Sequence, residues 1–177
     1  MTPADGPRIV FLTGASGSGK TSVVRALHAM DPAGVHLHFD RIGVPDRETM
    51  IREFGSGERW QQEMTRRWVA RIVTDHPREA LVFFEGQVRP SFILGALEEH
   101  RVARGEIILI HCADEEREAR LRGRGQPDLA NAEMRSWSAF LLQDAKARGL
   151  HVVDTTGVSV VDAAAAVSRI AGSALPG

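Results

Sequence analysis

Cysteine is almost absent from this chain of 177 residues, which contains only Cys112. With one thiol no disulfide can form within the chain, and this favours a reducing, cytoplasmic setting. Long apolar runs are missing as well, since no segment approaches the roughly 20 residues that cross a bilayer. The first residues, MTPADGP, also lack the basic and apolar regions of a signal peptide. We therefore expect a cytoplasmic protein without a membrane partner.

An excess of charge of either sign is lacking too. Lysine and arginine together number 22 and aspartate and glutamate 23, which leaves a net charge of -1. Because the backbone of a long nucleic acid calls for a basic surface, we do not expect such a partner. The length suits one domain with a proper core and is short for two. A monomer and a homodimer are both compatible with the sequence.

Glycine and serine, by contrast, are concentrated near the start of the chain, in TGASGSGKTS at residues 13–22. The spacing matches the P-loop pattern GxxxxGK(S/T) at every fixed position. In such a loop, glycines let consecutive backbone N–H groups curl around phosphates at the start of a helix. The apolar run RIVFLT before it and TSVVRALHAM after it supply the strand and the helix that the motif requires. The predicted nucleotide-binding residues are Gly14, Ser16, Gly17, Ser18, Gly19, Lys20, Thr21 and Ser22.

Two side chains of this motif carry specific chemistry. Lys20 would reach the β- and γ-phosphates as a catalytic cation, and the Thr21 hydroxyl would bind Mg²⁺. The predicted cofactors are therefore ATP and Mg²⁺. ATP is preferred because the guanine-reading pattern (N/T)KxD of GTPases does not occur in the chain. The chain is also too short for the second subdomain of most motor ATPases, so kinases of small molecules or nucleotides are the leading class.

Short apolar runs alternate with longer amphipathic ones, which indicates a single α/β domain over residues 1–177, built from βαβ units around a parallel sheet. The predicted strands are 8–13, 35–39, 81–85, 106–111 and 151–154. The predicted helices are 20–30, 58–75, 90–103, 114–122, 131–148 and 159–171. Two segments rich in glycine, proline and charge, 41–57 and 122–130, are expected to form mobile covers on the ligand-binding side.

Two acidic residues follow predicted strands at the edge where ligands bind in parallel sheets. Asp40, at the end of the second strand, would be the catalytic base that contacts the acceptor hydroxyl, or would help to hold Mg²⁺ through water; capping the next turn is the structural alternative. Glu85, at the matching place on the third strand, would hold a substrate hydroxyl or a Mg²⁺-bound water, with a salt bridge as its alternative. Gln87 and Arg89 follow on the same edge as further substrate-binding candidates.

Arginines are dense in the segment ADEEREARLRGRGQPD. On a helix Arg117, Arg120 and Arg124 share a face, whereas Arg122 lies off it. A solvated face with internal Glu/Arg pairs is the usual explanation. The neighbouring glycines suggest a lid instead, and phosphoryl transfer needs cations that close over the transferring group. Arg120 and Arg124 are therefore candidate catalytic lid arginines, and Arg117 is assigned a structural role.

Tryptophans and histidines have a structural default. Trp60, Trp68 and Trp137 lie at helical spacing among apolar neighbours, which predicts core packing. Trp60, the nearest to a glycine-rich turn, is also a candidate for the wall of a substrate pocket. His36 and His38 alternate along a predicted strand, and we expect both to be buried histidines with satisfied hydrogen bonds, because no partners complete a metal site.

With these residues in place, the chain resembles P-loop kinases of the shikimate kinase, gluconate kinase and chloramphenicol phosphotransferase group. The residues IVFLTGASGSGKTSVVRALHAM and HLHFD resemble the opening of chloramphenicol phosphotransferase-like proteins, in which an aspartate after the second strand is the proposed base; that position is Asp40 here. IREFGSGERWQQE is similar to the substrate segment of shikimate kinases, and ARLRGRGQP to their arginine-bearing lid.

The resemblance implies a three-layer P-loop kinase fold, with helices on both faces of a five-stranded parallel sheet of order 2-3-1-4-5. It also implies ATP with Mg²⁺, a substrate-binding region at about 41–76, a lid at about 120–131, and adenine held partly by DTTGVS after the last strand. Two departures count against shikimate and nucleoside monophosphates as acceptors. EGQVRP replaces the glycine turn that follows the third strand of shikimate kinases, and the DG(F/Y)PR segment of adenylate kinases is missing.

The sequence thus predicts a phosphotransferase that moves the γ-phosphoryl group of ATP to a hydroxyl of a small polar metabolite or antibiotic. A second possibility keeps the kinase chemistry but makes a nucleotide or a nucleic-acid end the acceptor. A third possibility, from another class, is an ATP-binding switch without a small-molecule acceptor.

Overall fold

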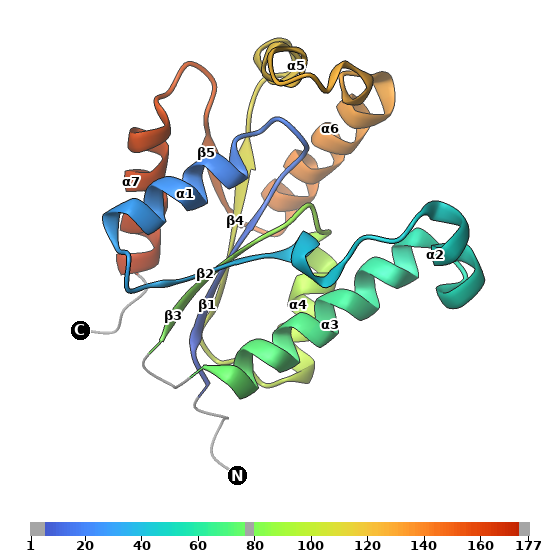
Figure 1. The fold of residues 1–177 in the computed structure, drawn as a ribbon. Helices are drawn as coiled ribbons and strands as arrows, with labels where there is room; N and C mark the ends of the chain where they lie inside the picture. The colour runs from blue at the N-terminus through green and yellow to red at the C-terminus, as the bar shows by residue number, and fades with distance from the viewer. Residues whose placement is uncertain (1–5, 77–79, 174–177) are drawn as a thin grey trace.

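The computed structural model of the chain describes residues 6–76 and 80–173 (Figure 1). Residues 1–5, which carry most of the segment compared with signal peptides, lie outside the described part. Five parallel strands form one sheet in the order β2-β3-β1-β4-β5, so the predicted order is confirmed. The strands are β1 (Arg8–Thr13), β2 (Val35–His38), β3 (Leu81–Glu85), β4 (Gly105–His111) and β5 (His151–Asp154).

The central strand explains why the apolar runs in this chain are continuous rather than alternating. All six residues of β1 are buried, because helices cover both faces of the sheet. In the register of the sheet, Phe11 lies between Phe84 of β3 and Ile107 of β4. All five strands point the same way, so their carboxyl ends gather at one edge, and the P-loop begins at the centre of that edge.

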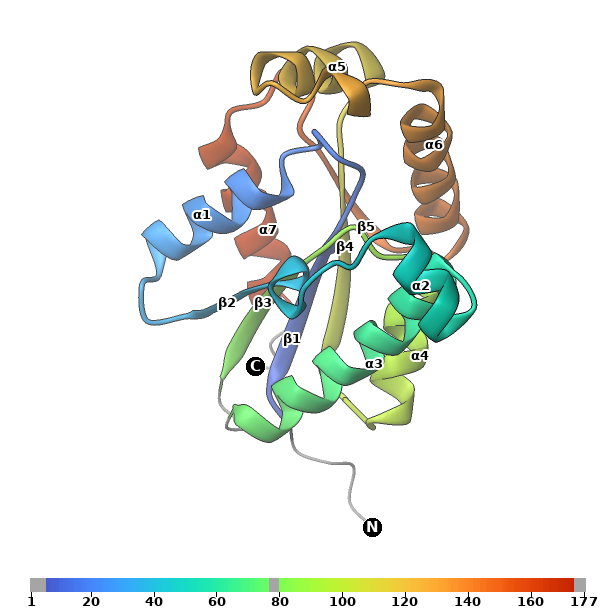
Figure 2. The ribbon, with the colours of Figure 1, turned by 45° about the vertical axis from the view of Figure 1, so that its right-hand side comes forward.

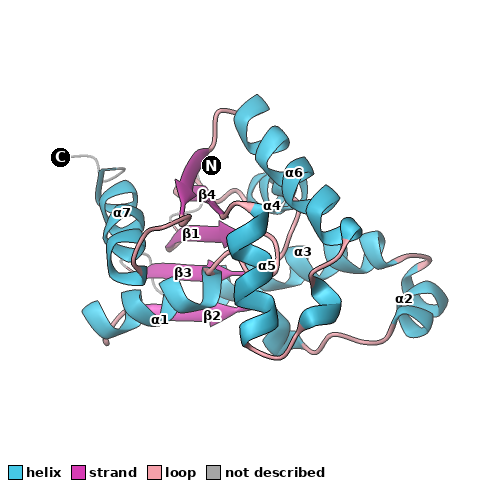
Figure 3. Cartoon of the chain, turned by 90° about the horizontal axis from the view of Figure 1, so that it is seen from above, coloured by secondary structure: helices cyan, strands magenta, loops and turns pink. Residues whose placement is uncertain are grey.

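Helices form a layer on each face of the sheet, and one more helix crosses its carboxyl edge. α1 and α7 cover one face, and α3, α4 and α6 cover the other, while α5 lies above the strand ends (Figures 1, 2 and 3). The α-helices are α1 (Lys20–Met30), α2 (Arg47–Phe54), α3 (Gly57–Asp75), α4 (Pro90–Glu99), α5 (Asp114–Gly123), α6 (Ala132–Ala147) and α7 (Val160–Ser173). Two short 3-10 helices, η1 (Phe39–Ile42) and η2 (Pro127–Leu129), complete the list.

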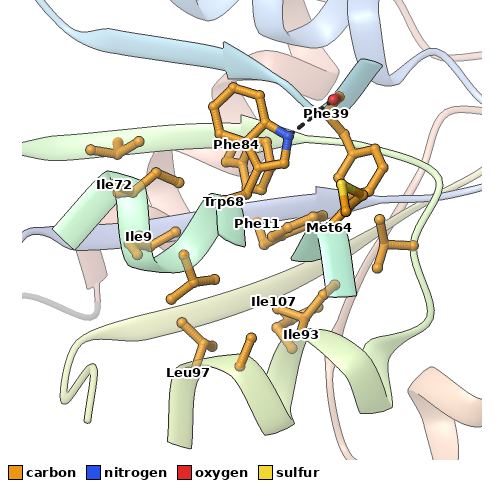
Figure 4. Close-up of a cluster of buried hydrophobic side chains, with 14 of the residues drawn as sticks. Ile9, Phe11, Phe39, Met64, Trp68, Ile72, Phe84, Ile93, Leu97 and Ile107 are labelled. Carbon is orange, nitrogen blue, oxygen red and sulfur yellow. Dashed lines mark hydrogen bonds between the residues drawn. The ribbon is translucent and has the colours of Figure 1, made fainter. Parts of the chain in front are cut away.

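The largest core cluster lies between the sheet and helices α3 and α4 (Figure 4). Trp68 of α3 packs against Phe84 of β3, with 5.1 Å between ring centres. Its indole Nε1 donates a hydrogen bond of 3.0 Å to the backbone carbonyl of Phe39. This bond ties the start of η1 to the core, and η1 is the element that carries Asp40.

Several predicted boundaries differ from the structure by one residue or more. The segment 41–57, expected to be a mobile cover, contains the two-turn helix α2, which is capped by the Asp46 side chain and followed by Gly55 at a φ of 83°. The strand predicted to reach residue 39 ends at His38, and the helix predicted to reach residue 103 ends at Glu99. Of the helices in the described ranges, none is long and apolar enough to cross a membrane.

Candidate active site

The P-loop connects β1 to α1, and its glycines provide space and unusual dihedral angles. A Cβ atom on Gly14 would lie 2.3 Å from the carbonyl oxygen of Ile110, so no side chain fits there. Gly17 and Gly19 have φ values of 85° and 101°, which disfavour any residue with a Cβ. No side chain caps the start of α1, so its first N–H groups are free to bind an anion.

Lys20 is the cation of this loop. The residue is 9% exposed, and its Nζ donates a 3.0 Å hydrogen bond to the carbonyl of Ala15. Burial lowers the pKa of Lys20 to about 8, against the opposing effect of the nearby Glu85 carboxylate. A phosphate brought to this ammonium would supply the counter-charge that the site lacks, so the loop favours a ligand with several negative charges.

A cavity of about 300 Å³ opens in front of the P-loop at the carboxyl edge of the sheet. It gathers most of the predicted site residues, although they come from four separate segments of the chain. Its lining consists of Ser16, Gly17, Gly19, Lys20, Thr21, Ser22, Asp40, Glu85, Gly86, Gln87, Arg124, Gln126 and Leu129. Of the predicted nucleotide-binding residues, Gly14 and Ser18 are buried behind this lining.

Glu85, the last residue of β3, lines the P-loop cavity. The residue is 8% exposed, so its carboxylate needs partners, and the structure provides two. Nδ1 of His38 lies 2.7 Å from Glu85 Oε1, and the Thr21 hydroxyl donates a 3.3 Å bond to the same oxygen. The expectation that His38 is a core histidine is therefore wrong: its side chain is 24% exposed and paired with the carboxylate beside the P-loop.

The oxygen donors that line the P-loop cavity suit a magnesium ion. Thr21, Glu85 and Asp40 all line the cavity, and hydroxyl and carboxylate oxygens are the ligands that Mg²⁺ prefers. Within the described ranges, no group of three or more acidic, histidine or cysteine side chains forms a closed metal site. This donor set fits an ion that is shared with nucleotide phosphates better than one held by the protein alone.

Asp40 lies just beyond the strand end where it was predicted. Instead of ending β2, it occupies η1, the 3-10 turn that follows the strand. Its side chain is exposed and lines the P-loop cavity opposite Lys20, whose pKa it tends to raise. The turn therefore brings an accessible carboxylate to the cavity that Lys20 also lines.

The three arginines that were predicted to share a helix face have different hydrogen-bond partners. Arg117 is fully buried beneath the P-loop, where it donates to the Ser16 carbonyl at 3.3 Å and to Asp114 at 2.9 Å. Arg120 donates to the backbone carbonyl of Thr155 at 2.8 Å and to the carboxylate of Glu116. Both guanidinium groups are thus bound to protein oxygens.

Arg124 differs from its two neighbours. It lies just beyond the end of α5, is exposed, and lines the P-loop cavity. Its guanidinium makes no hydrogen bond or ion pair with any residue in the described part of the chain. Of the two predicted lid arginines, Arg124 is therefore the one whose donors are available to a phosphate.

The loop after β5 is fastened to α5. The backbone N–H of Gly157 donates a 2.7 Å bond to Glu116, and the Thr155 hydroxyl donates a 2.8 Å bond to the Ser18 carbonyl of the P-loop. The segment DTTGVS, for which the family resemblance implies contact with adenine, therefore lies against the P-loop.

A second, larger cavity of about 640 Å³ adjoins the first. The two cavities share Gln87 and Leu129, so a ligand in one can approach a ligand in the other. The wall residues come from α3, the β3–α4 loop, and α6 with the residues before it: Gly57, Glu58, Gln61, Gln87, Arg89, Leu129, Asn131, Glu133, Met134, Ser136, Trp137 and Phe140.

The tryptophan of this larger cavity is not the predicted one. Trp60 is 6% exposed and packs edge-on against Phe39 in the core, and it lines neither cavity. Trp137 packs against the core cluster of Leu109, Leu141 and Ala145, as expected, and it also lines the larger cavity. Its position on α6 places it above Arg89, whose guanidinium carbon lies 4.9 Å from the ring centre. Spacing alone could not separate the two tryptophans, because both follow the helical period.

The geometry of the P-loop agrees with a family match. A family model described as an AAA domain matches residues 10–138, which is more than half of the chain. The chain belongs to the AAA domain family. The matched range of this AAA domain starts in β1 and ends within α6, so it contains the P-loop, Asp40, Glu85 and Arg124. Among curated proteins, none matches the chain in sequence.

Solved structures resemble this AAA domain along nearly its whole length. A gluconokinase from Sinorhizobium meliloti 1021 is 19% identical with a TM-score of 0.63, and the match covers 94% of this chain and 95% of that one. For a shikimate kinase from Acinetobacter baumannii, in complex with shikimate, the values are 17%, 0.60, 94% and 94%. For a tunicamycin resistance protein from Deinococcus radiodurans they are 15%, 0.66, 94% and 96%. The predicted P-loop kinase fold is thereby confirmed.

Proposed function

We propose that this chain is an ATP- and Mg²⁺-dependent phosphotransferase that moves the γ-phosphoryl group of ATP to a hydroxyl of a small molecule. One observation carries the proposal: the P-loop cavity, with Lys20 and Asp40 on its walls, opens through Gln87 and Leu129 into a second cavity of about 640 Å³. A nucleotide switch needs a phosphate site but has no use for such an acceptor chamber.

The protein groups would act mainly by position and charge. The N–H groups of the P-loop and the Lys20 ammonium would hold the β- and γ-phosphates, and Arg124 would face the charge that develops on the transferring group. Asp40 would accept the proton of the acceptor hydroxyl as that oxygen approaches phosphorus. Thr21 and Glu85, which line the P-loop cavity, would hold Mg²⁺. The bound ion would neutralise negative charge along the phosphates.

A panel of metabolites and antibiotics that carry hydroxyl groups tests the proposal through acceptor-dependent release of ADP. The Lys20→Ala protein serves as the blank, because its P-loop has lost the cation. Lys146→Ala is a matched control, since Lys146 is exposed on α6 outside both cavities. We expect release with the wild type and the control and none with Lys20→Ala. Slow hydrolysis of ATP that only a protein partner stimulates would instead favour a switch.

A further inference from the structure

The larger cavity has an apolar wall that comes mainly from one helix. Met134, Trp137 and Phe140 follow each other at three-residue steps on α6, so they occupy neighbouring positions on its surface, and Leu129 of η2 extends this wall. The rings of Trp137 and Phe140 are stacked, with 5.4 Å between their centres and 21° between their planes. Phe140 is 39% exposed. The parts of these rings that face the cavity offer an apolar surface to a ligand.

Three amide side chains of the same cavity are bound by the protein itself. Gln61 donates to one backbone carbonyl at 2.9 Å and accepts from one backbone N–H at 3.3 Å. Asn131 caps α6 with its oxygen and donates its amide to a carbonyl at 2.7 Å. The side-chain oxygen of Gln87 accepts from Ser16 at 2.9 Å. Glu58, Glu133 and Ser136 also line the cavity, and their side chains make no hydrogen bond in the described part of the chain, so these oxygens remain open to a ligand.

Arg89 is the only cationic side chain among the residues that line this cavity. Its guanidinium lies against the rings of Trp137 and Phe140, at 4.9 Å and 5.1 Å, and cation–π attraction holds it there. The nearest carboxylate, that of Glu58, is 3.8 Å from Nε, which is longer than a hydrogen bond. None of its guanidinium N–H groups has a hydrogen-bond partner in the part of the chain described here. A fixed guanidinium with open N–H edges suits a carboxylate.

We propose that the acceptor is an aromatic alcohol that carries one carboxylate. This inference rests on the proposed phosphotransferase function and specifies its acceptor. The ring would lie on Trp137 and Phe140, the carboxylate against Arg89, and the hydroxyl toward Gln87, where the two cavities meet. In the reaction the bond between the γ-phosphorus and the oxygen of ADP breaks, the acceptor oxygen bonds to that phosphorus, and the hydroxyl proton passes to Asp40.

Three probes separate the ring from the carboxylate and from a polyol: 4-(hydroxymethyl)benzoate, benzyl alcohol and gluconate. Their affinities for the full chain, with a non-hydrolysable ATP analogue and Mg²⁺ present, are measured by calorimetry. We expect 4-(hydroxymethyl)benzoate to bind at least about tenfold more tightly than either of the others, since each lacks one of its two contacts.

Variants locate the binding. Phe140→Ala changes a half-exposed side chain, so the fold is retained, and we expect it to weaken the binding of 4-(hydroxymethyl)benzoate about fivefold or more. Arg89→Gln is expected to remove the preference for 4-(hydroxymethyl)benzoate over benzyl alcohol. Leu94→Ala, at a residue of α4 that is 38% exposed and lines neither cavity, is the matched control and is expected to change nothing.

The outcomes distinguish this inference from the proposed function. Gluconate that binds as tightly as 4-(hydroxymethyl)benzoate, or affinities that Phe140→Ala and Arg89→Gln leave unchanged, would overturn the aromatic acceptor. Tight binding of 4-(hydroxymethyl)benzoate to wild type and Lys20→Ala, with the expected variant effects but no release of ADP from wild type, would support the binding site and overturn the phosphotransferase.

Discussion

The two adjoining cavities are built in opposite ways. Much of the P-loop cavity comes from one local segment, residues 13–22, whose backbone N–H groups and glycine dihedral angles do not depend on distant side chains. The larger cavity takes its walls from α3, the β3–α4 loop and α6, and uses side chains almost throughout. A phosphate site made of backbone stays the same when side chains change, whereas a wall made of side chains can be altered one residue at a time. Under the proposed function, the first cavity would carry the reaction and the second would select the acceptor.

The largest effect is expected in the P-loop cavity, at Asp40. Asp40→Asn keeps the shape of η1 but removes the proton acceptor, so turnover should fall by roughly 10²- to 10⁴-fold. The affinity for ATP should change by less than about threefold, because the P-loop amides and Lys20 remain. Steady-state ADP release and calorimetry with the ATP analogue measure the two quantities. Full turnover in this variant would show that Asp40 is not the base.

The next effect separates Arg124 from Arg120. Arg124→Ala should lower turnover by about 10²- to 10³-fold and leave the free energy of unfolding unchanged, because its guanidinium faces the cavity without a protein partner. Arg120→Ala should reduce the free energy of unfolding by about 1–3 kcal/mol, because carbonyls beside the P-loop lose their donor. Urea denaturation and ADP release are measured for both. A reversed pattern would assign the lid role to Arg120.

Stability should also reveal the cost of Lys20. At pH 7 Lys20→Met should raise the free energy of unfolding by roughly 1–2 kcal/mol, because burying the ammonium costs more than its bond to Ala15 returns. Since the native pKa is about 8 and the ordinary value 10.5, the unfolded chain holds the extra proton between these two values. Wild-type stability therefore rises with pH in this window, and the advantage of the variant shrinks. Denaturation from pH 7 to 10.5 measures this trend. An advantage of Lys20→Met that stayed constant across the window would contradict it.

The smallest effect tests the bond between the cavities, from the Ser16 hydroxyl to Gln87. Ser16→Ala should raise the KM for the acceptor a few-fold, which corresponds to about 0.5–1.5 kcal/mol, because the Gln87 amide loses its orientation. The KM for ATP should hardly change, since the loop backbone is intact. Steady-state kinetics with each substrate varied in turn give both constants. Equal changes in both KM values would mean that Ser16 serves the nucleotide alone.

The parts that could be predicted are those encoded locally. The strand at 8–13, the helix at 20–30 and the motif between them lie within 23 consecutive residues, where apolar runs and glycine spacing are sufficient. The sheet order came from the resemblance that this motif carried. Asp40 could be placed near the P-loop because the carboxyl ends of parallel strands share one edge.

The parts that were missed depend on tertiary contacts or on weak local signals. The pairing of His38 with Glu85 joins residues 47 positions apart, and no sequence pattern in either strand predicts it. Trp137 belongs to a wall that exists only when α6 stands beside the β3–α4 loop. Helix α2 buries no residue completely, and only Met50 and Phe54 pack against the core, so its hydrophobic period is too short to stand out. Its signals were the cap residue Asp46 and the glycine at 55, which start and stop rules could have used.

The hydrogen bonds that hold α5 in place determine which neighbouring residues remain free to move. Arg117 and Arg120 anchor this helix to the P-loop, and Glu116 anchors it to the turn at Gly157. A rigid swing of the whole helix would break all of these bonds at once. A lid motion of the proposed kind would therefore pivot at the end of α5, between Gly123 and Gly125, and would move only the few residues that follow, with Arg124 at their start.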